Sequence, residues 1–384
     1  MGGENGGRAA TLRGSLSESA TSQKLRERFE FRAARAFAKL PPKAQVRLSR
    51  KPPVEIGGCR LDPEIQLTLA LLERRGLPPI ETLPVDVARQ VVVAQASLYG
   101  GPPLPCGSVR DITIDGAEGP LNARYYTPDE PGGPHPLLIY YHGGGFVICD
   151  LDTHDAPCRV LCKHGGVNVL SVDYRLAPEH PFPAAVDDAR AALRWAYEHA
   201  EELGADPERI AVGGDSAGGN LATVACQLAA RDGGPAPVFQ LLIYPVTDMS
   251  SERPSRQLFA EGFFLTESEM EWFSDNYIGG VEVDTTDPRI SPILADDLSG
   301  LPPAYIVTCG FDPLRDEGEE YAHALRAAGV PTALRRFPGL IHAFINSVGV
   351  SPVSRDALIE VAGATRAMLS TTAAKVAQQA AEVS

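Results

Sequence analysis

The stretch Gly214-Asp215-Ser216-Ala217-Gly218 decides how this 384-residue chain is interpreted. It follows an apolar run at residues 210–213 and precedes a helical pattern at residues 217–231. A Gly-x-Ser-x-Gly sequence between a buried strand and a helix is typical of a sharp turn that presents a serine hydroxyl. The glycines fit because such a turn is strained and leaves little room for side chains. The pattern alone arises by chance in roughly one chain in five of this length, so its context must decide.

A second glycine-rich stretch, His142-Gly143-Gly144-Gly145, provides this context. It follows another apolar run, at residues 137–141. Consecutive glycines allow backbone N–H groups to turn toward a ligand without interference from side chains. Such a loop forms one half of an oxyanion hole, and the N–H of the residue after the serine, here Ala217, forms the other half. The two motifs together predict that Ser216 is a nucleophile.

A serine hydroxyl needs a general base, and the base needs a carboxylate that orients it. In the chain order nucleophile, acid, histidine, only His323 and His342 follow Ser216. His323 lies in the middle of a helical pattern, where an exposed histidine is the ordinary interpretation. His342 lies in a loop just past the last predicted strand, where a base can approach the serine. The sequence therefore predicts His342 as the base.

Three aspartates are candidates for the acid. Asp312 follows the apolar run at residues 305–309 and precedes Pro313. Asp316 comes one helical turn later, where its charge suits the start of a helix. Asp248 follows an earlier predicted strand. Asp312 is the preferred acid, and Asp316 and then Asp248 are the alternatives.

Short apolar runs alternate with helical patterns over the last two thirds of the chain. The predicted strands are residues 109–114 and 121–126, which alternate like a hairpin, and 137–141, 167–172, 210–212, 241–243, 305–307 and 332–337. The predicted helices are residues 153–164, 184–203, 217–231, 317–328 and 353–369. This alternation predicts an α/β fold with a central, mostly parallel, eight-stranded sheet that is flanked by helices. In such a sheet the chemistry lies beyond the carboxyl ends of the strands.

The first 53 residues form a basic extension, with 12 Lys/Arg and 4 Asp/Glu, whereas the whole chain has a net charge of -14. One face of a predicted helix at about residues 22–40 carries Leu25, Phe29, Ala33, Phe37 and Leu40, and Pro41 and Pro42 end it. We expect this face to pack on the acidic body or in a homodimer, because opposite charges attract. Docking at a membrane interface is the less favoured alternative, followed by disorder.

Composition excludes several classes of protein. The acidic pI of about 5.1 argues against a nucleic-acid partner, because a negative surface repels phosphates. The sequence contains no apolar run of eighteen residues and no secretory signal at its start. Seven irregularly spaced cysteines indicate reduced thiols and a cytoplasmic location. His154, Cys158, Cys162 and His164 do not have a common zinc spacing, so no metal site is expected.

Several stretches resemble the hormone-sensitive-lipase-like esterases, the bacterial family IV, in the subgroup whose serine turn is GDSAG. They are HGGGFV, SVDYRLAPEHPFPAA, VGGDSAGGN, LLIYP, LPPAYI, FDPLRDEG and GLIHAF, and the resemblance spans about residues 60–370. It implies an α/β-hydrolase catalytic domain at residues 108–384. It also implies a helical cap at residues 54–107, completed by an insertion near residues 250–290. The extension at residues 1–53 has no counterpart in this resemblance.

The resemblance also implies roles for individual residues. Ser216, Asp312 and His342 would be nucleophile, acid and base, and no cofactor is implied. The oxyanion hole would be formed by the N–H groups of Gly144, Gly145 and Ala217, with Gly143 shaping the turn. His142 would brace that loop, and Tyr174, Arg175 and Glu179 would be scaffold residues behind the site. Phe264, Leu265, Met270 and Phe273 of the insertion are expected to line the substrate pocket.

The predicted function is that of a serine carboxylesterase, which hydrolyses short- to medium-chain acyl esters through an acyl-enzyme. A lipase acting on longer acylglycerols and an amidase or carbamate hydrolase are alternatives, because they use the same triad. A non-catalytic receptor for a small ligand is the least favoured interpretation, because such receptors in this fold lack the histidine that His342 provides. The expected partner is therefore a small-molecule ester.

Overall fold

The computed structural model describes residues 31–130 and 132–383, and the side chains of residues 371–383 are not described. An eight-stranded sheet with the order β10-β9-β8-β7-β5-β6-β4-β3 forms its centre. The strands are β3 (Ser108–Gly116), β4 (Gly119–Thr127), β5 (His135–Tyr141), β6 (Asn168–Val172), β7 (Ala205–Asp215), β8 (Gln240–Ile243), β9 (Ala304–Phe311) and β10 (Thr332–Ile341). All neighbours from β10 to β6 pair in parallel, while β4 pairs antiparallel with both β6 and β3. The predicted α/β-hydrolase fold, with a mostly parallel sheet, is confirmed.

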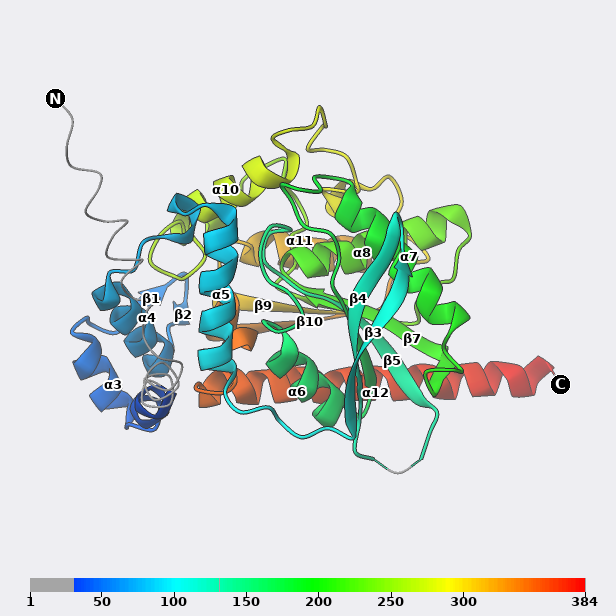
Figure 1. The fold of residues 1–384 in the computed structure, drawn as a ribbon, viewed down its shortest axis with the longest axis horizontal. Coiled ribbons are helices and arrows are strands. Elements are labelled where there is room, and N and C mark those ends of the chain that lie inside the picture. The colour runs from blue at the N-terminus through cyan, green and yellow to red at the C-terminus, as the bar shows by residue number, and fades with distance from the viewer. Residues whose placement is uncertain (1–30, 131, 384) are drawn as a thin grey trace.

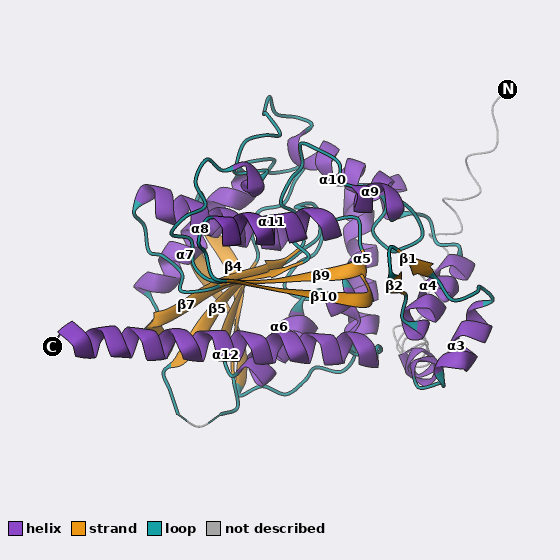
Figure 2. Ribbon diagram, turned by 180° about the vertical axis from the view of Figure 1, so that it is seen from behind, coloured by secondary structure: helices purple, strands orange, loops and turns teal. Residues whose placement is uncertain are grey.

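Burial explains why the parallel strands are apolar throughout. Every residue of β6, β8 and β9 is buried, because helices cover both faces of the sheet. Figure 2 shows the two layers edge-on, with α7, α8 and α11 on one face and α6 and α12 on the other. These helices are α6 (Asp155–Gly165), α7 (Ala184–Glu198), α8 (Ala217–Asp232), α11 (Arg315–Ala327) and α12 (Pro352–Val383). The edge hairpin of β3 and β4 is only half covered, which matches its alternating sequence.

Two helix ends differ from the sequence prediction. Helix α7 ends at Glu198, five residues before the predicted end at residue 203. Helix α12 continues to Val383, fourteen residues beyond the predicted end at residue 369, and projects past the sheet in Figure 1. Alanines and other good helix formers after residue 369 explain the second difference, since they extend a helix without any apolar face to mark it.

The cap covers the carboxyl ends of the strands. Its first part is α4 (Pro63–Arg75), the short 3-10 helix η1 (Ile80–Thr82) and α5 (Val85–Gly100). Asp62 begins α4 by accepting the N–H of Glu64, and Gly76 ends it in the left-handed conformation. Its second part is α9 (Pro254–Leu258) and α10 (Glu267–Ile278), from the insertion predicted near residues 250–290. Figure 1 shows α5 and α10 on the same side of the molecule.

The described part of the basic extension is helical. Residues 31–38 form one helix, and α3 (Pro42–Ser49) forms another. Of the apolar face predicted at residues 22–40, Leu25 and Phe29 lie outside the described residues. The first helix ends before Pro41, as expected, but the sequence analysis did not predict α3. The reason is that Pro42 occupies the first turn of α3, where a missing N–H costs nothing, so the same proline pair both ends one helix and starts the next.

Across residues 31–130 and 132–383, no helix is both long enough and apolar enough to span a membrane. All seven cysteines belong to the described part, and each of them is a free thiol.

Candidate active site

Ser216 lies in the sharp turn between β7 and α8. Its backbone has φ 54 and ψ -119, a left-handed conformation that a side-chain-bearing residue rarely adopts. The N–H of Ser216 donates to the carbonyl of Ile243 at 2.9 Å, and this bond fixes the turn to β8. A Cβ on Gly218 would lie 1.8 Å from the carbonyl oxygen of Tyr141, and a Cβ on Gly214 would lie 2.4 Å from the same atom. Both glycines are therefore required by close packing of the turn against β5.

His342 and Asp312 lie next to this serine. The Nε2 atom of His342 is 3.0 Å from Ser216 Oγ, and its Nδ1 atom is 2.9 Å from Asp312 Oδ2. Asp312 directly follows β9 and His342 directly follows β10, so both come from the carboxyl ends of neighbouring strands. All three side chains are buried. The other oxygen of Asp312 accepts the N–H of Leu314 at 2.9 Å, which fixes the carboxylate toward the imidazole.

The alternative acids and the alternative base have other partners. Asp316 accepts the N–H of Ser255 at 2.9 Å and pairs with Arg315 in the first turn of α11. Asp248 is ion-paired with Arg253 at 2.6 Å. His323 is exposed on α11. The structure thus brings together Ser216, Asp312 and His342, but none of these three alternatives.

The glycine loop at residues 143–145 faces the serine turn, and its three glycines differ in their contacts and backbone conformations. The N–H of Gly143 donates to Asp215 Oδ1 at 3.0 Å, so it is engaged behind the site and not free to hold an oxyanion. The prediction that Gly143 shapes the turn agrees with this contact, whereas a place for its N–H in the oxyanion hole does not. Gly144 has φ 113 and Gly145 has φ 58, conformations that favour glycine. A Cβ on Gly145 would lie 2.2 Å from the ring of Phe273, so the cap presses directly on this loop.

Asp215 holds this loop to the serine turn, a role that the sequence analysis missed. Besides Gly143, its Oδ1 accepts the hydroxyl of Tyr140 at 2.7 Å, and His154 Nε2 lies 3.2 Å away. Burial would raise the pKa of Asp215, but His154, Tyr140 and the Gly143 N–H together hold it below its ordinary value. The carboxylate of Asp215 therefore lies against the glycine loop at residues 143–145. Its position inside the GDSAG stretch was visible in the sequence, but its partners come from β5 and the loop before α6.

The residues predicted to brace the glycine loop or to be scaffold contact different parts of the structure. His142 is fully buried with its Nδ1 atom 2.7 Å from the Gly143 carbonyl, and its ring stacks on Tyr174 at 4.4 Å. Burial lowers the pKa of His142 to about 4, which keeps this imidazole neutral. Arg175 pairs with the buried Asp188 at 2.8 Å. Glu179 pairs with Arg89 of α5 at 2.7 Å and so connects the catalytic domain to the cap.

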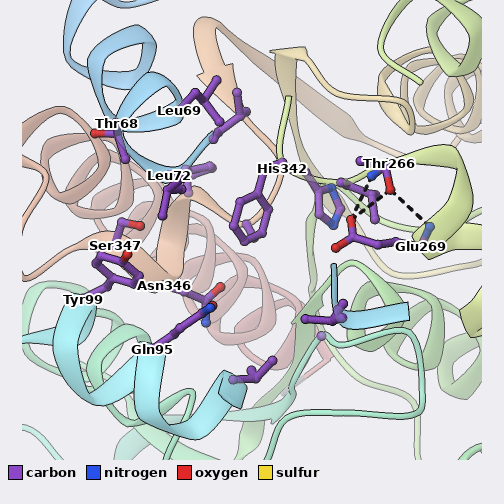
Figure 3. Close-up of a pocket in the computed structure, with 18 of the residues that line it drawn as sticks. Thr68, Leu69, Leu72, Gln95, Tyr99, Thr266, Glu269, His342, Asn346 and Ser347 are labelled. Carbon is purple, nitrogen blue, oxygen red and sulfur yellow. Dashed lines mark hydrogen bonds between the residues drawn. The ribbon is translucent and has the colours of Figure 1, made fainter. Parts of the chain in front are cut away.

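A cavity of about 1150 Å³ opens above Ser216 and His342. Its walls include all four residues predicted from the insertion: Phe264, Leu265, Met270 and Phe273. In Figure 3, Thr266 and Glu269 lie on one side of His342, while Leu69, Leu72, Thr68 and Tyr99 lie on the other. The cap helices α4 and α5 therefore supply as much of the wall as the insertion does, which the sequence analysis did not assign residue by residue.

Glu269 is a further residue near the base that the sequence analysis missed. It accepts the N–H of Thr266 at 2.9 Å, and Thr266 in turn accepts the N–H of Glu269 at 3.1 Å, which makes a capping box at the start of α10. Burial raises the pKa of Glu269 to about 7, although its hydrogen bonds and nearby His342 act in the opposite direction. The sequence Thr-x-x-Glu predicts such a capping box, but it does not predict that the box lies near the imidazole of His342.

No cluster of three or more histidine, cysteine or acidic side chains that could hold a metal ion occurs in the described parts of the chain. His154, which the sequence analysis examined as a metal ligand, instead faces Asp215. In the site itself, His342 Nε2 lies within hydrogen-bond distance of Ser216 Oγ, a geometry that allows proton transfer between them.

Comparison with known proteins agrees with this geometry. The family described as alpha/beta hydrolase fold matches residues 138–346. The carboxylic ester hydrolase LipN of Mycobacterium tuberculosis is 49% identical over 340 residues, which cover 86% of this chain and 89% of that protein. Ethyl acetate hydrolase of Pseudomonas putida is 40% identical over 309 residues, which cover 78% of this chain and 97% of that protein.

A solved ester hydrolase from the metagenome of Lake Arreo superimposes with a TM-score of 0.78 at 45% identity, covering 80% of this chain and 98% of that one. The chain belongs to the α/β-hydrolase family that these proteins share. Within that family it falls in the hormone-sensitive-lipase-like group, as its sequence motifs indicated.

Proposed function

We propose that this protein hydrolyses short- to medium-chain acyl esters, with Ser216 as nucleophile, His342 as base and Asp312 as acid. That it is a carboxylic ester hydrolase follows from its family and from relatives that are 40–49% identical over most of its length. The observation that carries the mechanism is the chain of two contacts from Ser216 Oγ to His342 and from His342 to Asp312, at 3.0 and 2.9 Å.

The reaction would proceed by acyl transfer. His342 Nε2 takes the proton of Ser216 as Oγ attacks the ester carbonyl and forms a tetrahedral oxyanion. The N–H groups of Gly144, Gly145 and Ala217 would hold that oxyanion, and each such donor contributes about 3 kcal/mol to the transition state. His342 then protonates the leaving alcohol, which leaves an acyl-serine. Water attacks this ester with His342 as base again, and the carboxylic acid is released.

Two features of the structure support the roles of the neighbouring groups. Asp312 faces Nδ1 of His342, so it selects the imidazole tautomer whose Nε2 can accept the serine proton. Asp215 fixes the loop that bears Gly144 and Gly145 through the N–H of Gly143. The N–H groups are thus oriented before the substrate arrives, and preorganised donors stabilise a developing charge most strongly.

The test is hydrolysis of p-nitrophenyl esters of increasing acyl length, with the matching p-nitroanilides beside them, by wild type and Ser216→Ala. We expect turnover of the esters by wild type, no turnover by the variant, and little turnover of the anilides. A serine-directed organophosphate should add once, at Ser216. An adduct on Cys149 or Cys309 in its place, or anilide hydrolysis at rates equal to those of the esters, would contradict the proposal.

A further inference from the structure

The cavity above the catalytic serine is larger than a short ester requires. Cavities of about 300–1000 Å³ bury most of a drug-sized ligand, and this cavity measures about 1150 Å³. It extends from Ser216 and His342 past α4 and α5. Figure 3 shows Leu69 and Leu72 of α4 on the side of His342 opposite Glu269. An ester with a small acyl group and a small alcohol would fill only the part nearest the serine.

The far wall of this cavity comes from the basic extension. Ala33, Ala34, Phe37 and Ala38, all from the helix at residues 31–38, line it together with the leucines of α4. All four side chains are apolar. Three of them are single methyl groups, which take up little of the space in front of this wall. Their neighbour Ala36 lies on the exposed side of the same helix and does not line the cavity.

The described part of this helix has two close contacts. The Phe31 ring packs so closely on Gly101 that a Cβ at Gly101 would lie 2.8 Å from it. At its end, the buried side chain of Gln45 in α3 donates to the carbonyl of Ala38 at 3.0 Å. These two contacts join the helix to the end of α5 and to α3.

Helix α3 is in turn fastened to α4. Gln66 Nε2 of α4 donates to Ser49 Oγ at 2.9 Å, and Arg74 donates to the carbonyl of Ser49 at 2.6 Å. Both donors come from the cap helix that also supplies the leucine wall. The extension and the cap therefore form one continuous wall around the space that begins at the catalytic serine.

We propose that the helix at residues 31–38 is the distal wall of the substrate site and sets the longest apolar chain that the enzyme accepts. The proposal rests on the proposed function, and it names the substrate class as esters that carry an extended, unbranched apolar chain. This chain runs from the ester group at Ser216 along Leu69 and Leu72, and its end lies against Ala34. The chain can belong to the acyl group or to the alcohol, and the experiment distinguishes the two.

The experiment compares Ala34→Trp with Ala36→Trp in the full-length protein. An indole at position 34 would fill the distal cavity, whereas one at position 36 would point to solvent. Values of kcat/KM are measured for p-nitrophenyl acetate, butyrate, octanoate and dodecanoate, and for the acetates of ethanol, butanol, octanol and dodecanol. In Ala34→Trp we expect the values for the longest chains of one series to fall about tenfold or more. Those for acetate and butyrate should stay within about twofold, and Ala36→Trp should match wild type.

Phe37→Ala gives a second readout that does not depend on whether the tryptophan variant folds. It removes a ring from the same wall and enlarges the cavity. It should therefore raise the preferred chain length in the substrate series whose longest members react more slowly with Ala34→Trp. Identical chain-length profiles for Ala34→Trp and Ala36→Trp would overturn the proposal. So would a wild-type enzyme that hydrolyses nothing longer than the butyl or butyryl compounds. The proposed function fails separately, namely if Ser216→Ala still hydrolyses acetate.

Discussion

The loops at the carboxyl ends of the strands and the helices that cover them are built differently. At the strand ends, Ser216, Asp312 and His342 are at most 8% exposed, and each is held by a named hydrogen bond. Around the cavity, large apolar side chains remain open to solvent, with Leu77 at 56% and Phe264 at 48% exposure. Such side chains have no hydrogen-bonding groups, so only packing can fix their direction.

The difference suits the strand-end loops to the chemical step and the cap helices to the choice of substrate. Proton transfer requires atoms at hydrogen-bond distance, so the strand-end loops are packed until almost no side chain can be added. Accepting an apolar chain requires only space and apolar contact, so the cap can be looser and more exposed. Substitutions at the strand ends should therefore change the rate of the chemical step, while substitutions in the cap should change which substrates react and at which pH.

The largest effect should come from the triad itself. Ser216→Ala and His342→Ala should each lower kcat by about four to six orders of magnitude, because members of a triad act as a unit. The melting temperature should change by only a few degrees, since neither side chain fills a large volume. Steady-state hydrolysis of p-nitrophenyl butyrate and a melting curve measure both quantities. A variant that retains a tenth of the wild-type kcat would show that the residue does not do the chemistry.

The acid should come next. Asp312→Asn should lower kcat by about two to four orders of magnitude, because an amide favours the wrong imidazole tautomer. Asp316→Asn is the matched control, since this carboxylate lies four residues away but contacts Ser255 and Arg315 instead of His342. We expect the control to change kcat less than about threefold. If Asp316→Asn were the damaging change, the acid would have to be reassigned.

A third test is placed where the two regions touch. Gly145→Ala would put a methyl group 2.2 Å from the Phe273 ring of α10, so the oxyanion loop must shift and kcat should fall about a hundredfold. Gly300→Ala is the control, because Gly300 also has a left-handed backbone, with φ 70, but no atom within 4 Å. Adding Phe273→Ala should restore part of the rate. No restoration would mean that backbone strain, and not contact with the cap, limits Gly145→Ala.

The smallest effect should be a shift in pH dependence caused by the cap. Burial raises the pKa of Glu269 to about 7, so its carboxylate becomes charged near the pH at which a histidine base must lose its proton. Once charged, it favours the protonated imidazole of His342. Glu269→Gln removes this charge while an amide oxygen can still accept from Thr266. The rise of kcat/KM with pH should therefore begin roughly half a unit lower in the variant.

The control for this pH shift is Glu267→Gln, two residues earlier in α10, where the carboxylate pairs with Arg256. Its profile should coincide with that of wild type. A Glu269→Gln profile that moves to higher pH would show that the carboxylate does not act on the imidazole through its charge.

The sequence predicted those features that depend only on residues close together in the chain. The GDSAG turn, the glycine loop and the eight predicted strands all depend on local backbone geometry, so residue type and order were sufficient to predict them. The start of α3 at Pro42 was not predicted, because a proline pair signals an end and a beginning equally well. The contact of Gly143 with Asp215 joins residues 72 positions apart, and no local pattern announces it.

The sequence by itself determined the fold class and predicted the candidate nucleophile, base and acid, because hydrophobic periodicity and turn chemistry are local properties. Only the tertiary structure decided three other things: that Asp215 accepts the N–H of Gly143 in the glycine loop, that Glu269 lies near His342, and that the helix at residues 31–38 lines the cavity above Ser216. Each of these depends on side chains from distant segments meeting at a defined distance. Such distances arise from how helices and strands pack, and packing is a property of the whole chain.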